Sequence, residues 1–335
     1  MLSILIPVYN FNVTRLVQTL AEQCAATGEA YEIICFDDGS TPEFKAQNQP
    51  IQDIKHIDYQ ELPKNLGRSA IRNALGQAAQ YPYLLFMDCD SEVVSKDYIN
   101  NYLEPLRKEG YTRPQPLKGS ATLNSNDNKE NKSTLTSPSG VGGKQSKSPN
   151  LIYGGRCYHP TPPKDLALYF HWKYGTEREV STAQARSHRP YHSFMTNNFL
   201  IEKRIFEQIK FDEQLTQYGH EDTLFGMELM KRKVSILHID NPLKHIGLEI
   251  TSTFLDKTQK GIKTLQFLIN RGDKIETKLT KVADILQKLG LRKAYIAVFA
   301  KRSTKIEANL HSTKPNMRLF DLWKLGILLQ TSSSK

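Results

Sequence analysis

Short apolar runs that end in polar residues are the main pattern in the first hundred positions of the chain. These runs span residues 3–8, 32–36 and 83–87. Uninterrupted apolar runs of this length predict strands that are buried on both faces, as in the middle of a parallel sheet. The segments between them, residues 13–26 and 65–79, have helical spacing. The pattern therefore predicts βαβ units and an α/β fold: a Rossmann-like, mostly parallel sheet flanked by helices.

The strand pattern resumes later in the chain, after a break. Residues 113–150 are rich in Ser, Thr, Asn, Gly, Pro, Gln and Lys and poor in aliphatic residues, which predicts a disordered insertion in a surface loop. Ordered structure is expected to resume at residues 151–156, where a glycine pair predicts either a tight turn or close backbone approach to a ligand. Residues 193–201 and 234–240 predict two more strands. Residues 160–193 hold many Pro, aromatic, Arg and His residues without periodicity, and we interpret them as a loop that covers a substrate.

The C-terminal part, residues 251–335, differs in pattern and in charge. Its apolar residues recur at helical spacing, and it carries 17 Lys and Arg against 6 Asp and Glu. Subtracting these from the 45 basic and 35 acidic residues of the whole chain leaves 28 and 29 for residues 1–250. The basic excess therefore lies in the tail. We predict a catalytic domain over residues 1–250 and a basic, mostly helical appendage over residues 251–335.

Two further features limit the class of protein. No apolar run reaches the roughly 20 residues that a membrane span requires, and the N-terminus lacks the basic flank of a signal peptide, so we expect a cytoplasmic protein. Four cysteines, Cys24, Cys35, Cys89 and Cys157, are scattered without Cys-x-x-Cys spacing. They indicate neither a zinc knuckle nor a disulfide framework.

Polar residues directly follow three of the predicted strands. They are Tyr9 and Asn10, Asp37 and Asp38, and Asp88 and Asp90. In a doubly wound sheet the carboxyl ends of the strands meet along one edge, where such sheets bind their ligands. Two carboxylates separated by one residue suit Mg²⁺ or Mn²⁺, which take carboxylate oxygens and complete their shell with substrate phosphates. The alternative, that each acid merely caps the following helix, accounts for one cluster better than for three.

A second chemical centre is predicted at Glu221 and Asp222. Both follow a Gly-containing loop and precede a helical pattern, so the helix dipole favours their negative charge. Capping alone would explain that placement, but a carboxylate held there also serves as a general base if it faces the pocket. His245 lies in what we interpret as a loop beside Gly247, where it is either a solvated histidine or a third metal ligand.

Together these motifs resemble the nucleotide-diphospho-sugar transferases with the GT-A fold, and glycosyltransferase family 2 in particular. The resemblance covers residues 1–110 and 150–250. It is carried by Ile-Pro-Val-Tyr-Asn from residue 6, Asp-Asp-Gly-Ser from residue 37, the segment from Asn65 to Asn73, and Asp-x-Asp from residue 88. Gly-His-Glu-Asp from residue 219 is similar to the Gly-Gly-Glu-Asp pattern of the β-galactosyltransferase group. His220 stands where that group usually has Gly, so the acceptor does not follow from the resemblance.

The resemblance implies donor-binding residues along the sheet edge. The end of the first strand would flank the donor base, the acids after the second would bond the uracil or an equivalent ring, and later residues would lie near the ribose and the phosphates. The corresponding residues here are Pro7, Tyr9, Asp37, Asp38, Asn65, Arg68 and Asp88.

The resemblance also implies a metal site and a catalytic base. Asp88 and Asp90, completed by His245, would hold Mn²⁺ or Mg²⁺, with Asp90 as a direct ligand. Asp222 matches the catalytic base of the family, and Glu221 is the second candidate.

The implied function is that of an inverting glycosyltransferase. The metal ion would neutralise charge on the departing nucleoside diphosphate, while one carboxylate accepts the proton of the attacking hydroxyl. A single base and an in-line displacement invert the anomeric carbon. We expect a UDP-sugar as donor and a saccharide or lipid-linked saccharide as acceptor, in the synthesis of cell-surface polysaccharide or glycan.

Two other classes of protein are weighed against this one. Sugar nucleotidyltransferases carry a Gly-rich loop after the first strand, where Pro-Val-Tyr-Asn stands here, and haloacid-dehalogenase-type phosphatases place their Asp-x-Asp after the first strand. The remaining alternative is a non-catalytic protein with a nucleotide fold whose basic tail binds a membrane or nucleic acid.

The basic tail predicts peripheral contact with the inner face of a membrane. Residues 319–329 are too few to span a bilayer and too apolar to be left in water. They either pack on the catalytic domain or lie in the interface with Phe320 and Trp323 among the headgroups. We favour the membrane over packing on the catalytic domain, because clustered Lys and Arg are attracted to anionic lipids and lipid-linked acceptors are found there. We expect no nucleic-acid partner.

Overall fold

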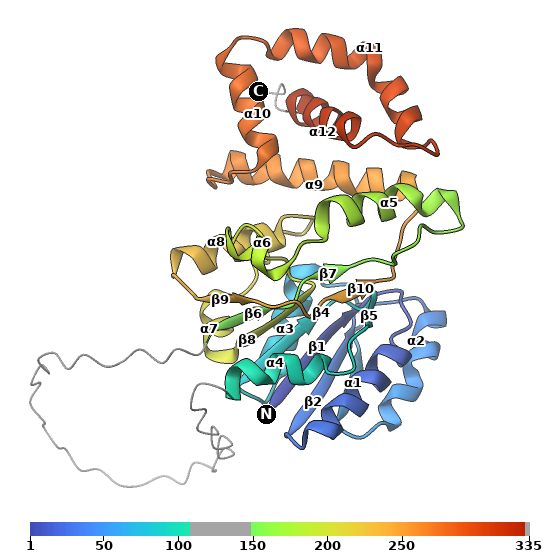
Figure 1. The fold of residues 1–335 in the computed structure, drawn as a ribbon, viewed down its shortest axis with the longest axis vertical. Helices are drawn as coiled ribbons and strands as arrows, with labels where there is room; N and C mark the ends of the chain where they lie inside the picture. The colour runs from blue at the N-terminus through green and yellow to red at the C-terminus, as the bar shows by residue number, and fades with distance from the viewer. Residues whose placement is uncertain (108–148, 332–335) are drawn as a thin grey trace, which may run out of the picture.

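The computed structural model describes residues 1–107 and 149–331, and the predicted insertion over residues 113–150 lies almost wholly outside the described residues (Figure 1). The strands are β1 (Leu2–Val8), β2 (Tyr31–Asp37), β3 (Ile57–Glu61), β4 (Tyr83–Met87), β5 (Ser91–Val93), β6 (Leu151–Tyr153), β7 (Arg156–Cys157), β8 (Asn198–Glu202), β9 (Ile236–His238) and β10 (Leu243–His245). The α-helices are α1 (Thr14–Thr27), α2 (Pro42–Asn48), α3 (Arg68–Ala78), α4 (Tyr98–Arg107), α5 (Tyr169–Tyr174), α6 (Ala183–Ser187), α7 (Lys203–Ile209), α8 (Glu221–Lys231), α9 (Thr251–Arg271), α10 (Lys278–Lys288), α11 (Arg292–Leu310) and α12 (Met317–Thr331). Shorter helical segments are η1 (Gln49–Asp53), η2 (Leu166–Leu168) and η3 (Gly175–Glu179).

A seven-stranded sheet forms the centre of the molecule. Its strand order is β3-β2-β1-β4-β8-β6-β9. Strand β1 pairs in parallel with both β2 and β4, and β8 runs antiparallel to its neighbours β4 and β6. Because β6 and β9 are again parallel, β8 is the one reversed strand of this sheet. The predicted α/β fold with a mostly parallel sheet is confirmed.

The central sheet is buried on both faces. Along β1, Ile4 and Ile6 belong to the core under α1 and α4, while Leu5 belongs to the core under α3, α7 and α8. Successive side chains of a strand point to opposite faces, so helices on both sides require apolar residues at every position. This explains why the strand runs are continuously apolar rather than alternating.

A second sheet of three short strands lies beside the carboxyl end of β4. In it β10 runs antiparallel to β5 and parallel to β7, and His245 pairs in register with Ser91. The prediction that His245 lies in a loop is wrong, because it is the last residue of β10 and its side chain is buried. A three-residue strand carries too little periodicity to be recognised in the sequence.

Residues 160–193, interpreted above as a covering loop, contain the short helices η2, α5, η3 and α6. Helix α5 lies against α9 over the small sheet, as Figure 1 shows. A run of short helices has too few turns to display a period, which is why the sequence showed none.

Helices α9 to α12 form the C-terminal region, with α9 lying between the rest of that region and the sheet (Figure 1). Phe320 and Trp323 of α12 are 2% and 3% exposed, and they share a core with Phe170 of α5 and Phe299 of α11. The interpretation that Phe320 and Trp323 insert among lipid headgroups is therefore wrong. No helix within the described residues is both long and apolar enough to cross a membrane.

Candidate functional site

The carboxyl ends of β1, β2 and β4 meet at one edge of the central sheet. Val8 is paired with Asp37 between β1 and β2, and Leu5 is paired with Phe86 between β1 and β4. All three strands therefore end at nearly the same level. The polar residues that follow them are brought together by parallel pairing, as their position after each strand predicts.

Asp37 and Asp38 hold the loops at the rim of this edge. Asp37 is fully buried and accepts hydrogen bonds from the Ser40 amide (2.7 Å) and the Tyr59 hydroxyl (3.4 Å). The Asp38 carboxylate accepts from the amides of Leu66 (2.6 Å) and Gly67 (3.1 Å). Burial raises the pKa of Asp38, and these two backbone hydrogen bonds oppose the rise. Both acids thus have partners inside the protein, and their contact with a donor base stays a prediction.

The more exposed members of the predicted donor set surround these acids. Tyr9 projects from the end of β1 with 53% of its surface exposed. Pro7, in β1, is partly exposed. Asn65 donates from Nδ2 to the backbone oxygen of Asp38 (2.9 Å), which fixes the loop before α3. Arg68, the first residue of α3, lies with its guanidinium 4.6 Å from the ring centre of Tyr218.

Asp88 lies between two arginines. Its Oδ1 accepts from Arg72 of α3 (2.6 Å) and its Oδ2 from Arg156 of β7 (3.3 Å). Arg156 continues to Glu179 (3.1 Å), which also accepts a hydrogen bond from the Tyr158 hydroxyl. Buried charges are tolerated when they are paired in this way, so the network gives Asp88 a defined orientation.

The sequence analysis did not identify Arg72, Arg156 or Glu179 as site residues. Arg72 follows Arg68 by four positions, which places both on one face of a helix, and this signal was sufficient to find it. Arg156 follows a pair of glycines, Gly154 and Gly155, where the sequence predicts a tight turn or close backbone approach to a ligand. Glu179 ends a single π-helical turn, a local geometry that the sequence does not display and that often occurs at functional sites.

Asp90 and His245 meet at the junction of the two sheets. Asp90 Oδ1 and His245 Nδ1 are 3.5 Å apart, and Asp90 Oδ1 and both ring nitrogens of His245 are buried without a hydrogen-bond partner. A side chain at Gly247 would place its Cβ 2.7 Å from the Asp90 Cβ, so glycine is required for this approach. Unpartnered buried polar atoms are costly, and a carboxylate oxygen with an imidazole nitrogen is a donor set that fits Mn²⁺ or Mg²⁺.

The third predicted metal ligand, Asp88, is not part of this unpartnered group. Among residues 1–107 and 149–331, no cluster of three or more His, Cys, Asp or Glu side chains is arranged to hold a metal ion. Asp90 and His245 therefore supply two suitable metal donors. The carboxylate of Asp88, which the sequence suggested as a further ligand, is bound by Arg72 and Arg156 instead.

Charges around Asp90 keep it ionised. Burial would raise its pKa, but His245, Arg156 and Arg68 together hold the pKa of Asp90 well below its ordinary value. His171 of α5 lies with its ring centre 5.2 Å from that of His245. Burial and the neighbouring His245 lower the pKa of His171 to about 3, so this ring is neutral at physiological pH.

Glu221 and Asp222 open α8 and have opposite environments. Glu221 is buried and accepts from Arg68 (3.0 Å), and although burial would raise its pKa, Arg68 and Arg72 hold it below the ordinary value. Asp222 Oδ1 accepts from the Thr223 amide (2.7 Å), and burial and the adjacent Glu221 raise the pKa of Asp222 to about 6. Neighbouring carboxyls whose pKa values are driven apart take different roles.

His220 precedes α8 in the left-handed region, with φ of 69°. This region costs an L-residue roughly 1–2 kcal/mol, which gives a physical reason for glycine at the corresponding position of the galactosyltransferase pattern.

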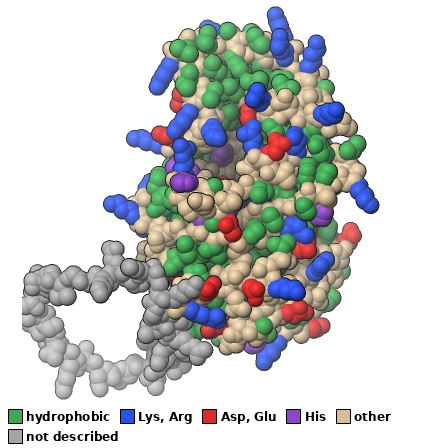
Figure 2. Space-filling view, viewed as in Figure 1, with side chains coloured by type: hydrophobic (Ala, Val, Ile, Leu, Met, Phe, Trp, Pro, Cys, Tyr) green, Lys and Arg blue, Asp and Glu red, His purple; other side chains and the backbone are tan. Residues whose placement is uncertain are grey.

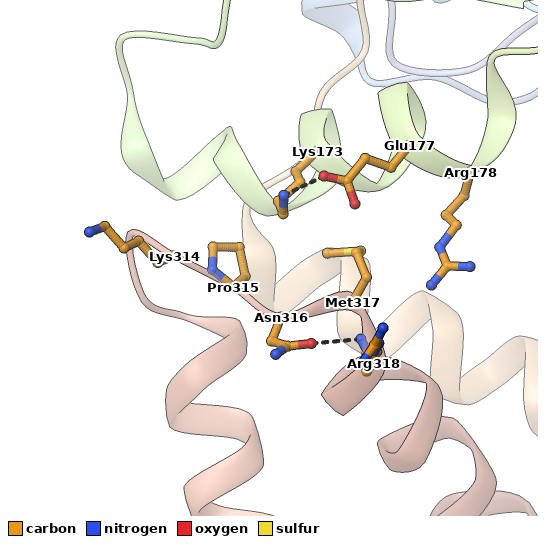
Figure 3. Close-up of a pocket in the computed structure, with 8 residues that line it drawn as sticks. All are labelled: Lys173, Glu177, Arg178, Lys314, Pro315, Asn316, Met317 and Arg318. Atoms are coloured by element: carbon orange, nitrogen blue, oxygen red, sulfur yellow. Dashed lines mark hydrogen bonds and ion pairs between the residues drawn. The ribbon is translucent and has the colours of Figure 1, made fainter.

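A separate cavity of about 440 Å³ lies between α5 and the connection of α11 to α12. Figure 3 shows the residues that line it: Lys173, Glu177, Arg178, Lys314, Pro315, Asn316, Met317 and Arg318. None of the predicted site residues lines this cavity, so the chemistry at the sheet edge does not depend on it.

Comparisons with known proteins bear on the fold and the family. The sequence model of the family described as Glycosyl transferase family 2 matches residues 3–159. The mannosyltransferase PcManGT from Pyrobaculum calidifontis, solved with GDP-Man and Mn²⁺, is 10% identical with a TM-score of 0.51, over 99% of this chain and 86% of that one. TarS 1–349 from S. aureus is 15% identical with a TM-score of 0.47, over 99% of this chain and 92% of that one. No curated protein matches the sequence. The likeness to the mannosyltransferase confirms the predicted GT-A fold.

Proposed function

The model of glycosyltransferase family 2 matches residues 3–159, and from this match we propose that the chain belongs to that family and is a metal-dependent, inverting glycosyltransferase. It would move a sugar from a nucleotide-diphospho-sugar to a hydroxyl of a saccharide or a lipid-linked saccharide. The observation that carries the proposal is that, within the described residues, Asp90 Oδ1 and both ring nitrogens of His245 are buried without a hydrogen-bond partner at the edge where the strand ends meet. Such a pair is costly in a protein that binds nothing there.

We propose that Asp90 and His245 are the protein ligands of a divalent metal ion, Mn²⁺ or Mg²⁺, that also binds the donor diphosphate. When bound, the ion supplies a Lewis acid that neutralises charge on the leaving phosphate oxygens. Asp88, fixed by Arg72 and Arg156, would orient the ribose and the arginines rather than contribute an unpartnered oxygen. Arg156, Arg72 and Arg68 add positive charge at the place where the nucleoside diphosphate would depart.

Asp222 is the proposed general base. Its raised pKa of about 6 makes it a stronger base than an ordinary carboxylate, yet it is still mostly ionised at neutral pH. Its Oδ1 is engaged by Thr223, and within the described residues no hydrogen bond reaches Oδ2, the oxygen that would accept the proton. Glu221 is less suited, because its ion pair with Arg68 lowers its basicity. One base acting on the face opposite the leaving group inverts the anomeric carbon.

The donor is proposed to be a UDP-sugar held by Pro7, Tyr9, Asp37, Asp38, Asn65, Arg68 and Asp88. Tyr9 is exposed beside the rim loops and presents a face on which a base can stack. The mannosyltransferase that shares the fold was solved with GDP-Man and Mn²⁺, a sugar nucleotide and a divalent ion of the classes proposed here. The product would belong to the synthesis of a cell-surface polysaccharide or glycan.

The test is a panel of nucleotide sugars. The purified chain is incubated with each one and Mn²⁺ or Mg²⁺, and thermal stabilisation and nucleoside diphosphate release are measured with and without EDTA. A true donor raises the melting temperature in proportion to the logarithm of its concentration over Kd, and only when the metal is present. Anomeric configuration, read by NMR on the first transfer product, tests inversion. Pyrophosphate formation from a nucleoside triphosphate and a sugar phosphate would contradict the proposal and identify a nucleotidyltransferase.

A further inference from the structure

Helix α10 carries a row of exposed aliphatic side chains. Val282, Ile285, Leu289 and the adjoining Leu291 are between 44% and 64% exposed. The first three are spaced at i, i+3 and i+7, which places them along one face of the helix. We call these four residues the α10 ridge.

The α10 ridge is additional to the face by which α10 packs on the molecule. Leu279 and Leu286, which border the ridge on the flank away from Lys281 and Lys288, are partly buried, and Thr280 is buried. Elsewhere in the C-terminal region Phe320 and Trp323 are enclosed, whereas Phe267, Ile269, Val298 and Leu322 on other helices are exposed. Single exposed aliphatic residues are ordinary, but a continuous row of them on one helix marks a surface that contacts something apolar.

Lysines border the α10 ridge. Lys278 and Lys288 are exposed and have no ion-pair partner within the described part of the chain, and Lys281 has only an exposed pair with Glu276 (3.1 Å). At 100° per residue, all three fall on or beside one flank of the row. Figure 2 shows hydrophobic side chains gathered over the C-terminal helices, with Lys and Arg side chains projecting around them.

We propose that the α10 ridge lies on an anionic lipid bilayer. Aliphatic side chains on one face with lysines alongside are the composition of helices that lie in the membrane interface, where the chains enter the acyl boundary and the ammonium groups meet phosphates. A second copy of the chain fits less well, because a two-fold contact between ridges would bring the lysine rows together. The proposal deepens the proposed function by placing the enzyme at lipid-linked acceptors, and it moves the membrane contact from α12 to α10.

The first experiment removes the apolar part of the surface. Full-length protein is co-sedimented with phosphatidylcholine vesicles that contain or lack phosphatidylglycerol. We expect the double variant Ile285→Ser, Leu289→Ser to bind the anionic vesicles at least about tenfold more weakly, since two aliphatic side chains would no longer be buried in the bilayer. The matched control is Met230→Ser, Leu237→Ser, two exposed apolar residues on α8 and β9, which should bind like the unaltered protein.

The second experiment removes the charge. The triple variant Lys278→Gln, Lys281→Gln, Lys288→Gln should bind the anionic vesicles at least about tenfold more weakly at low salt and lose most of its salt dependence. The control changes Lys55, Lys96 and Lys164 to Gln, three exposed lysines with no ion pair in the described chain, and it changes the net charge by the same amount. Only the α10 variant should be impaired.

Several outcomes would overturn the inference. They are absence of vesicle binding, equal binding by the α10 variants and their controls, and equal binding to vesicles without phosphatidylglycerol. A ridge-dependent dimer in sedimentation velocity without vesicle binding would assign the surface to a second copy instead. Donor hydrolysis without vesicles should be unchanged in the α10 variants. Vesicle binding without any turnover would contradict the proposed function and leave this inference standing.

Discussion

Charged side chains are paired with one another at the sheet edge, whereas within the described chain many of those on the C-terminal helices are exposed and unpaired. At the edge, Asp88 is enclosed by Arg72 and Arg156, and Glu221 is paired with Arg68. On the helices, basic residues outnumber acids by 17 to 6 over residues 251–335, and lysines such as Lys278 and Lys288 are exposed without a partner. Buried pairs hold specific orientations and are costly to break, whereas exposed charges act collectively and are screened by salt. Single substitutions of charged residues should therefore have large effects at the edge and small effects on the helices.

The largest expected effect is loss of the proposed base. Asp222→Asn keeps the size of the side chain but cannot accept a proton, so kcat should fall by roughly two to four orders of magnitude while donor affinity changes little. The assay is steady-state release of nucleoside diphosphate, with donor binding measured by calorimetry. Glu221→Gln is the matched control, and a larger loss of kcat in that variant would make Glu221 the base.

The second-largest effect is expected for substitution of Asp90, which lies at the junction of the two sheets. Asp90→Asn should weaken Mn²⁺ binding by at least about 100-fold, because changes one shell further from a metal already cost ten- to 100-fold. The readout is thermal stabilisation by Mn²⁺ together with UDP, which does not require an acceptor. Asp97→Asn, an exposed acid at the start of α4, serves as control. Unchanged stabilisation in the Asp90 variant would exclude it as a ligand.

Removal of a large side chain from the C-terminal core should destabilise the protein as much as it does in other hydrophobic cores. Phe320→Ala should lower the free energy of unfolding by about 3–5 kcal/mol. Because Phe320 shares its core with Phe170 of α5, we expect one unfolding transition for both regions rather than two. Calorimetry measures this directly. A separate low-temperature transition that leaves donor binding intact would show instead that the helices unfold alone.

The pH dependence of stability provides a smaller test of the edge. Asp222 has a folded pKa of about 6, above the ordinary aspartate value, so the native state binds more protons than the unfolded state between about pH 4 and pH 6. Stability is therefore lost as pH rises through this window and stays lower above it. Asp222→Asn should raise the free energy of unfolding by about 3 kcal/mol at pH 8 and by little at pH 3.5. Equal stabilisation at both pH values would contradict the raised pKa.

The smallest effect is expected at the contact beside the cavity of Figure 3. Arg178 forms an exposed ion pair with Asp321 (2.8 Å) between η3 and α12. Exposed pairs of this kind contribute about 0–1 kcal/mol, so Asp321→Asn should shift the melting temperature only slightly, and less at high salt. A loss as large as that of Phe320→Ala would mean that ion pairs, and not the shared apolar core, hold the two regions together.

Much of the fold was predictable because it depends on local pattern. The central residues of β1, β2 and β4 (residues 4–8, 33–36 and 84–87) are apolar in succession, as a strand buried on both faces requires. The position of Asp37, Asp38, Asp88 and Asp90 after those runs then placed them on one edge, since parallel strands end together. Helix α1 was predicted to within a residue or two of its observed bounds for the same reason.

Other features depended on contacts between segments distant in sequence. Nothing near Arg156 in the sequence indicates that it binds both Glu179 and Asp88, because β7, η3 and the end of β4 are brought together only in the folded chain. His245 was placed in a loop because three residues of β10 have no readable period, and its burial comes from pairing with β5.

The apolar and acidic patterns of the sequence by themselves determined the α/β sheet, its functional edge and the basic excess of the tail. Only the tertiary structure decided which charges are neutralised and which apolar faces are covered. Trp323 and Ile285 both occupy apolar positions on amphipathic helices, yet one is enclosed by α9 and α11 and the other is exposed on α10. Periodicity states that a face is apolar, whereas burial depends on what packs against it, which the sequence of a single helix does not contain.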